Sequence, residues 1–453
     1  MGQGRRPTRP ITRWSLVALA VVVAVLVLAP AALANGGVAP EWSTTWNAKT
    51  PGVVTNVHVA RTPFGEVYTA CSILRPTTGK YDVIVARYRA DGTRVWVHSW
   101  SRGTSYDDWV EGISSDPDGR LIVCGWTDRG KGGTPDWFVL KYGRNGTLLW
   151  TKTVGGSFGG DDRAVDLVVN GRSRIFVTGY ITQSTGGTDW RTMKITPKGA
   201  TSWSLSYKGS DKLDDKPSAI AIDVDRNIYV TGMEGTADHV RTDAVTVQYT
   251  KDGVRTWVAK YNDKGEDTGV DVAVRKSGVV VAVATIDQDA VATRATALQY
   301  TRAGEPVWAA PLDDANTVTD KFLCAGIDGL SRWVFGGYSV MTATADSTAR
   351  LMQYNATGVS DWSVNQSAPG DLLGDQFNDL YVAVDGTVWA TGAVAGTAVT
   401  WSFDAAGAAR WYGWNGVYDA VIADSGDALS VSGKAVYVAG RSGDSLVLMK
   451  YAR

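Results

Sequence analysis

Short apolar runs recur along the chain and are separated by turns rich in Gly and Asp. The runs are rich in Val, Ile, Tyr and Trp, which is typical of β-strands. From residue 35 onward, no stretch shows the 3.6-residue apolar period of an amphipathic helix. The pattern therefore predicts an all-β protein.

The most regular feature is a hairpin made of an aromatic residue, three residues, Gly, three residues and Trp. A tight hairpin needs a residue at positive φ, and Gly adopts that conformation without a Cβ clash. The copies are Tyr88/Gly92/Trp96, Tyr142/Gly146/Trp150, Ile195/Gly199/Trp203, Tyr249/Gly253/Trp257, Tyr300/Gly304/Trp308, Tyr354/Gly358/Trp362 and Phe403/Gly407/Trp411.

A second recurring feature lies upstream of each hairpin, an apolar run that ends in Gly or a small residue. It occurs eight times, against seven hairpins, and the units recur about every 52 residues between Tyr88 and Tyr451. With a preceding turn and short strand, each unit is predicted to contain four strands. Such a unit cannot bury both of its faces alone, so neighbours stack around an axis, and the sequence predicts a β-propeller.

The unequal counts predict how the ring closes. The last unit lacks a Trp strand before Arg453, whereas Trp42 and Trp46 have the spacing of Trp96 and Trp100. We expect residues 40–48 to supply the outer strand of the last blade. The predicted fold is a single eight-bladed propeller of four-stranded blades, with seven blades as the alternative.

Residues 1–34 are predicted to be a signal peptide rather than part of the fold. Four Arg residues precede an almost purely apolar run, and Ala32-Leu33-Ala34 is a small-residue cleavage site. An uncleaved membrane anchor is the alternative. Residues 35–453 would then form the propeller domain of a secreted or cell-surface protein, with no membrane insertion after cleavage.

The net charge narrows the choice of binding partner. The chain without residues 1–34 has 41 basic and 46 acidic side chains, a net charge of about −5, and no basic block. Nucleic acid is therefore not an expected partner.

Cys71, Cys124 and Cys324 lie in apolar strand patterns and are expected to be buried thiols, with a Cys71–Cys124 disulfide as the alternative.

The stretch Asp214–Asp223 leading to Asn227–Gly232 resembles the bacterial "beta-propeller repeat" called SBBP. The resemblance covers most of residues 35–453 and is clearest in the second to fourth units. That family's name implies seven blades, and it is exported or surface-associated and mostly of undefined function. The resemblance therefore implies a fold and a location, and it assigns no functional residue.

The Gly-x-x-x-Trp spacing is also similar to the docking motif of eight-bladed quinoprotein dehydrogenases and of a related lipoprotein scaffold of outer-membrane assembly. Those motifs usually carry Asp where Tyr88 and Tyr142 stand here, and the adjacent Cys pair of quinone dehydrogenases is missing. Quinone chemistry is therefore not expected. The Trp residues are expected to pack between blades.

The candidate site is a set of acids just before the innermost strands. In a propeller this loop lies near the mouth of the central channel, where a ring of like charges would focus potential on a cation, Ca²⁺ for example, or on a basic partner. The alternative is that each Asp caps a turn N–H. The candidate residues are Asp108, Asp162, Asp215, Asp267, Asp320 and Asp375, with Asp419 in the last unit.

These features predict an exported binding or scaffold protein, expected to be a monomer, that contacts a protein or polysaccharide of the cell envelope through its acidic, loop-rich face. Trp100, Trp109 and Trp126 fall near these loops, either exposed for binding or packed between blades. The alternatives are an envelope assembly scaffold and a carbohydrate-active hydrolase or lyase. Catalysis is less expected, because general acid–base work needs two acids with separated pKa values and the repeated Asp residues single out no pair.

Overall fold

A computed structural model describes residues 37–47, 53–128, 134–184, 186–209, 213–236, 241–263, 265–286, 293–312, 316–342, 344–366, 374–394, 396–414, 424–433, 435–442 and 444–453. The predicted signal peptide, residues 1–34, lies outside these ranges, as does Asp419. Within the described ranges every regular element is a β-strand, and no helix long and apolar enough to cross a bilayer occurs.

The strands form four-stranded antiparallel units, numbered here in chain order. Units one to four are β3 (Val54–Arg61), β4 (Val67–Arg75), β5 (Lys80–Tyr88) and β6 (Arg94–Trp100); β7 (Asp107–Ser115), β8 (Leu121–Asp128), β9 (Asp136–Tyr142) and β10 (Leu148–Val154); β11 (Arg163–Val169), β12 (Ile175–Thr182), β13 (Thr188–Ile195) and β14 (Thr201–Tyr207); β15 (Lys216–Ile222), β16 (Ile228–Gly235), β17 (Thr242–Tyr249) and β18 (Arg255–Tyr261).

The later units have the same strand order. Units five to eight are β19 (Glu266–Arg275), β20 (Gly278–Ile286), β21 (Thr293–Tyr300) and β22 (Pro306–Pro311); β23 (Thr317–Ile327), β24 (Trp333–Met341), β25 (Ser347–Tyr354) and β26 (Ser360–Gln366); β27 (Gln376–Val382), β28 (Val388–Val394), β29 (Thr397–Phe403) and β30 (Ala409–Trp414); β31 (Ser425–Val431), β32 (Ala435–Ser442) and β33 (Ser445–Ala452), completed by β2 (Trp42–Asn47). The short strand β1 (Gly37–Val38) runs parallel to β30.

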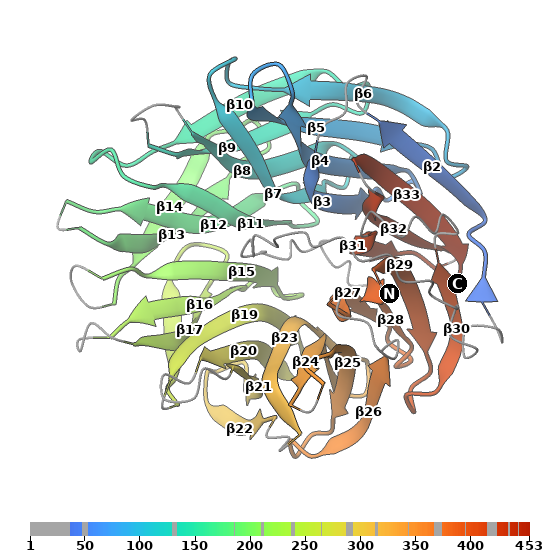
Figure 1. Cartoon of the computed structure of the whole chain (residues 1–453). Helices are drawn as coiled ribbons and strands as arrows, with labels where there is room; N and C mark the ends of the chain where they lie inside the picture. Colours follow the sequence, from blue (N-terminus) through green and yellow to red (C-terminus); the bar gives the residue numbers. More distant parts are fainter. Residues whose placement is uncertain are drawn as a thin grey trace.

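The units are arranged around a common centre, with the first strand of each innermost and the last at the rim (Figure 1). The hydrophobic clusters lie between neighbouring units rather than within them. One cluster joins units one and eight, through Val59 and Tyr88 on one side and Tyr437 and Leu448 on the other. The predicted all-β propeller of four-stranded units is therefore confirmed.

The chain ends meet in the eighth unit. Strand β2 pairs antiparallel with β33, from Trp42 opposite Lys450 to Asn47 opposite Ser445. Trp42 also reaches the first unit, because its Nε1–H donates to the carbonyl of Ala90 at 3.1 Å. The N-terminal strand thus completes the last unit and contacts the first, as the Trp spacing predicts.

The hairpin Gly residues hold neighbouring units together. Their φ angles lie between +80° and +89°, and each faces the Trp ring of the preceding unit; a Cβ on Gly304 would lie 2.6 Å from Trp257 Cδ2. Except at Trp308, the Trp Nε1–H then donates to the carbonyl two residues before that Gly. These bonds are Trp96–Arg144 at 2.9 Å, Trp150–Pro197 at 3.1 Å, Trp203–Lys251 at 3.2 Å, Trp257–Arg302 at 3.0 Å and Trp362–Ala405 at 3.3 Å.

Buried carboxylates join the innermost strands of units three, five and seven to those of the units that follow. Each of these Asp residues follows a register shift in its strand, and its second oxygen accepts a backbone N–H from the next unit. The bonds are Asp166 to Ile220 at 3.0 Å, Asp271 to Ala325 at 2.8 Å and Asp379 to Leu429 at 2.9 Å. From unit three to unit eight the inner strands therefore have a two-unit period on top of the one-unit repeat.

Cys71, Cys124 and Cys324 are buried, and no disulfide joins Cys71 to Cys124. Burial raises the pKa of the Cys71 thiol to about 12, which suppresses the reactive thiolate. The prediction of buried thiols is confirmed, and the alternative of a disulfide is wrong, because both side chains are packed into apolar clusters between blades.

Candidate functional site

The six candidate aspartates all lie in the predicted loop position, but their side chains point into the protein. Asp108, Asp162, Asp215, Asp267, Asp320 and Asp375 are each at most 3% exposed. Asp215 is representative: one oxygen accepts the N–H of Gly209 at 2.6 Å in the loop between units, and the other accepts the N–H of Gly235 at 3.1 Å at the end of β16.

Aspartates of the neighbouring units accept hydrogen bonds in the same way. Asp162 accepts backbone N–H bonds from Gly156 and Thr182, the latter at 2.7 Å. Asp267 accepts the N–H of Asp263 at 2.6 Å and the hydroxyl of Thr285 at 2.5 Å. These contacts support the alternative that each Asp caps a turn, and a ligand-binding ring built from them stays a prediction.

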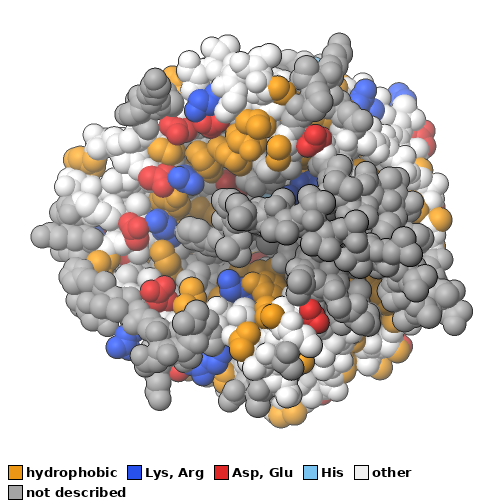
Figure 2. Space-filling view, in the orientation of Figure 1, with side chains coloured by type: hydrophobic (Ala, Val, Ile, Leu, Met, Phe, Trp, Pro, Cys, Tyr) orange, Lys and Arg blue, Asp and Glu red, His pale blue; other side chains and the backbone are white. Residues whose placement is uncertain are grey.

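Metal binding at this ring also stays a prediction. Across the described ranges, no three His, Cys, Asp or Glu side chains are grouped as metal ligands. The more exposed acids near the ring are held by cations of the same face: Lys80–Asp107 at 2.5 Å, Arg102–Asp136 at 2.8 Å, Arg163–Asp161 at 2.6 Å and Lys216–Asp214 at 2.8 Å. The face of the ring seen in Figure 2 likewise carries acidic and basic side chains close together.

Burial shifts the pKa of two of the aspartates that accept these backbone hydrogen bonds. It raises the pKa of Asp215 and of Asp267 to about 6, against the opposing effect of the hydrogen bonds that each accepts. The folded state therefore retains a proton on these groups above the unfolded pKa, which is about 3.9. The stability that this proton contributes is fully present below pH 4 and is lost as the pH rises through about 6.

We expect Asp215→Asn to flatten the pH dependence of folding. Between pH 4 and pH 7 the free energy of unfolding of the variant should fall less than that of the wild type, by about 1–2 kcal/mol. Urea unfolding at the two pH values measures this difference. Asp118→Asn changes an exposed carboxylate on the other face and is the control. A pH dependence identical in wild type and Asp215→Asn would contradict the shifted pKa.

A row of half-exposed side chains lies beside these loops on β5, β7, β8 and β11 of units one to three. Tyr81 packs on Trp109 with ring centroids 4.1 Å apart, and Trp109 stacks on Trp126 at 5.5 Å. The guanidinium of Arg163 then lies 4.1 Å from the Trp126 ring. We call Tyr81, Trp109, Trp126 and Arg163 the aromatic row. Trp100 does not belong to it, because it packs on Phe138 between blades.

Glu111 is hydrogen-bonded to the aromatic row through Trp126. Its Oε1 accepts the Trp126 Nε1–H at 2.9 Å. Burial raises the pKa of Glu111 to about 7, although the bond from Trp126 and the charge of Arg163 oppose this shift. Sequence reasoning missed both Glu111 and Arg163; the only signal was that they occupy inner-strand positions next to the Trp residues.

The comparisons with known proteins agree on the fold. Residues 117–148, from the turn after β7 to the start of β10, match a family model described as "Domain of unknown function (DUF5122) beta-propeller". No curated protein matches the chain. These matches do not confirm the resemblance to the SBBP repeat or to the quinoprotein docking motif.

Two solved structures illustrate the similarity. Sqt1 from Chaetomium thermophilum has a TM-score of 0.55 and 12% identity over 90% of this chain and 100% of that one. The acylaminoacyl peptidase of Pyrococcus horikoshii has a TM-score of 0.43 and 13% identity over 80% of this chain and 52% of that one. The chain is a β-propeller protein, a class that in general supports a binding or scaffold role; identities this low concern the fold alone.

Proposed function

We propose that this chain is an exported binding or scaffold protein that contacts a protein partner of the cell envelope through the aromatic row. The observation that carries the proposal is the continuous stack of Tyr81, Trp109, Trp126 and Arg163, half-exposed at the end of the ring where the blades connect. Trp, Tyr and Arg are the residues that most often dominate binding energy at protein interfaces.

The surroundings of the row also support binding. Its side chains stand on β5, β7, β8 and β11 rather than on long loops, so they are held in place before a partner arrives. The ion pair Lys80–Asp107 borders the row, and Asp161 pairs with Arg163 of the row itself, so these charges are already neutralised. An apolar centre with a polar border is the usual composition of a protein interface.

The test is a cross-linking pull-down from the cell surface with the chain lacking residues 1–34, followed by affinity measurement with the captured partner. We expect Tyr81→Ser and Trp126→Ser each to weaken binding at least tenfold while thermal melting shows a folded protein. Leu330→Ser is the matched control, because Leu330 is 70% exposed in the β23–β24 turn on the other face.

Equal affinity of Tyr81→Ser, Trp126→Ser and wild type for the captured partner would contradict the proposal. Binding of isolated envelope polysaccharide that is lost in the same two variants, with no protein captured, would replace the protein partner by the polysaccharide alternative. Secretion of the chain is checked in the same cells by locating it in the medium, on the surface or inside.

A further inference from the structure

A repeated cation joins the units on the face opposite the aromatic row. The residue before the first residue of the hairpin motif donates to the hairpin carbonyl of the next unit: Arg87 to Arg144 O, Lys141 to Pro197 O at 3.4 Å and Lys194 to Lys251 O at 2.7 Å. In the first two units a carboxylate neutralises this cation. Arg87 pairs with Glu66, and Lys141 pairs with Asp116 at 2.9 Å.

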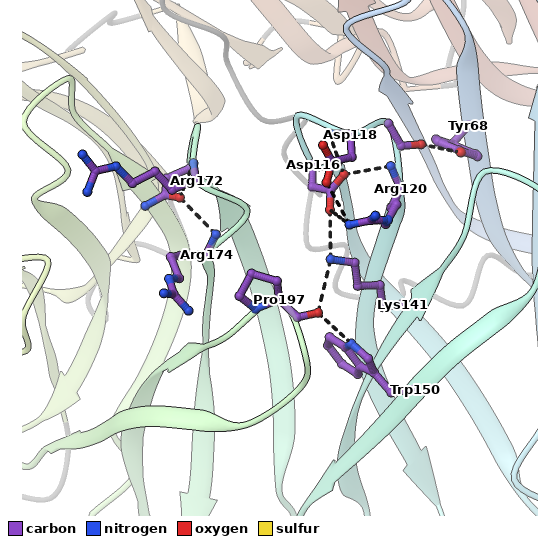
Figure 3. Close-up of polar contacts among 11 residues, drawn as sticks. Tyr68, Asp116, Asp118, Arg120, Lys141, Trp150, Arg172, Arg174 and Pro197 are labelled. Atoms are coloured by element: carbon purple, nitrogen blue, oxygen red, sulfur yellow. Dashed lines mark hydrogen bonds and ion pairs between the residues drawn. The ribbon is translucent and has the colours of Figure 1, made fainter.

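The third unit keeps the cation and loses the carboxylate. Asp116 Oδ1 accepts the N–H groups of Asp118 and Arg120 at 3.0 and 2.9 Å. In the corresponding turn, Asn170 Oδ1 accepts those of Arg172 and Arg174 at 2.9 and 3.0 Å. Asn170 therefore forms the same turn as Asp116 without its charge. Figure 3 shows the Asp116–Lys141 pair of unit two beside Arg172 and Arg174 of unit three.

Additional cations converge at this place. A cavity between units three and four is lined by Asn170, Arg172, Arg174, Lys194, Arg226, Lys251 and Asp252. Within the described ranges, no carboxylate forms an ion pair with Arg172, Arg174, Lys194 or Arg226. Asp252 pairs with Lys251, and Asp223 and Asp225, from the same turn as Arg226, pair with Arg302. The cavity therefore has a local excess of positive charge in a chain that is slightly acidic overall.

Arg226 is held in an unusual backbone conformation. Its φ is +69°, at the turn position that Gly119 occupies in unit two with φ +75°. A bulky residue in the left-handed region costs folding free energy, and such residues are concentrated at functional sites. In addition, burial lowers the pKa of Lys194, assisted by the nearby charges of Arg174 and Lys251 and opposed by Asp252.

We propose that this cavity binds a phosphate group, either free inorganic phosphate or pyrophosphate, or the phosphate end of a larger molecule. Arg172, Arg174 and Arg226 supply planar guanidinium groups that can hold phosphate oxygens two at a time, and Lys194 supplies a further positive charge in the lining. The cavity volume of about 220 Å³ is below the roughly 300 Å³ at which pockets for drug-sized ligands begin. It therefore suits a small anion or an end group rather than a large cofactor.

Asn170→Asp is the sharpest test, because it restores the carboxylate of unit two without altering the turn. Phosphate, pyrophosphate, phosphoserine and sulfate are titrated by calorimetry at constant ionic strength. We expect wild type to bind a phosphate-containing probe, and Asn170→Asp and Lys194→Gln each to weaken that binding at least tenfold. Arg226→Gly removes a cation at a position where Gly is the relaxed residue, so a loss of binding in this variant cannot be ascribed to a disturbed fold.

Glu66→Gln is the matched control, because it removes a carboxylate from the corresponding turn of unit one and leaves the cavity intact. Its affinity for the probe should equal that of wild type. Stronger binding of phosphoserine than of inorganic phosphate would identify the ligand as the end of a larger molecule, and the reverse order would identify the free anion; either result supports the site. No binding by wild type at 10 mM of any phosphate probe, tighter binding of sulfate, or equal binding by Asn170→Asp would overturn the proposal.

Discussion

Deleting residues 40–48 is expected to lower the melting temperature by about 3–7 °C. The deletion removes β2, and with it the partly buried rings of Trp42 and Trp46 and the whole pairing with β33. Burial of two large apolar side chains contributes about 3–6 kcal/mol, which in a domain of this size corresponds to a shift of this order. Differential scanning calorimetry of the two chains measures it.

Thr45→Ala is the control for this deletion, since it changes an exposed side chain of β2 and keeps the strand. It should alter the melting temperature by no more than about 1–2 °C. Trp42→Ala should lie between the two, because it removes the contact with Gly92 and the bond to Ala90 but leaves the strand pairing. A deletion variant with the same melting temperature as wild type would show that β2 does not hold the ring closed.

Asp116→Asn is expected to be the most destabilising single substitution of a charged residue on the turn face. The side chains of Asp116 and Lys141 are 0% and 1% exposed, and Asp116 Oδ2 lies 2.9 Å from Lys141 Nζ. Breaking a buried ion pair by removing one partner leaves an unpaired charge and typically costs about 3–5 kcal/mol. Urea unfolding at neutral pH measures the loss.

Two comparisons separate charge from shape in that experiment. Asn170 already forms the same turn in unit three, so Asn is compatible with this backbone and a large loss must come from the charge on Lys141. Asp116→Asn combined with Lys141→Met should recover a large part of the loss, because the charge is removed together with its partner. Asp118→Asn, which is exposed, should change stability by less than about 0.5 kcal/mol. Equal stability of Asp116→Asn and wild type would contradict the expected cost.

The sequence was sufficient to predict the fold because the repeat is a local signal. Each unit carries its own turn residues and apolar strands, and the missing Trp strand of the last unit identifies residues 40–48 as its replacement. The sequence predicts only one of the two roles of the hairpin Gly residues. Positive φ follows from hairpin geometry, whereas the contact of Gly304 with Trp257 joins two units and depends on how they stack.

The candidate site could be predicted less well, because spacing does not show where a side chain points. Asp215 occurs at the expected place, yet its carboxylate is turned inward onto Gly209 and Gly235. Asp166, Asp271 and Asp379 are not predicted by the one-unit repeat, because they occur only in units three, five and seven. The phosphate cavity draws residues from two units, and its only sequence signal is Asn170 in place of the Asp of unit two.

The pairing of β2 with β33 has a consequence for biosynthesis. Strand β2 is made among the first residues of the propeller, and its partner Leu448 is made among the last. Synthesis proceeds from the N-terminus, so both Trp rings of β2 stay without their partner strand until synthesis is almost finished. Until then the edge of β2 that pairs with β33 is also unpaired, and an unpaired strand edge invites association with other chains. A chaperone that covers β2 during this interval would protect the newly made protein from aggregation and proteolysis.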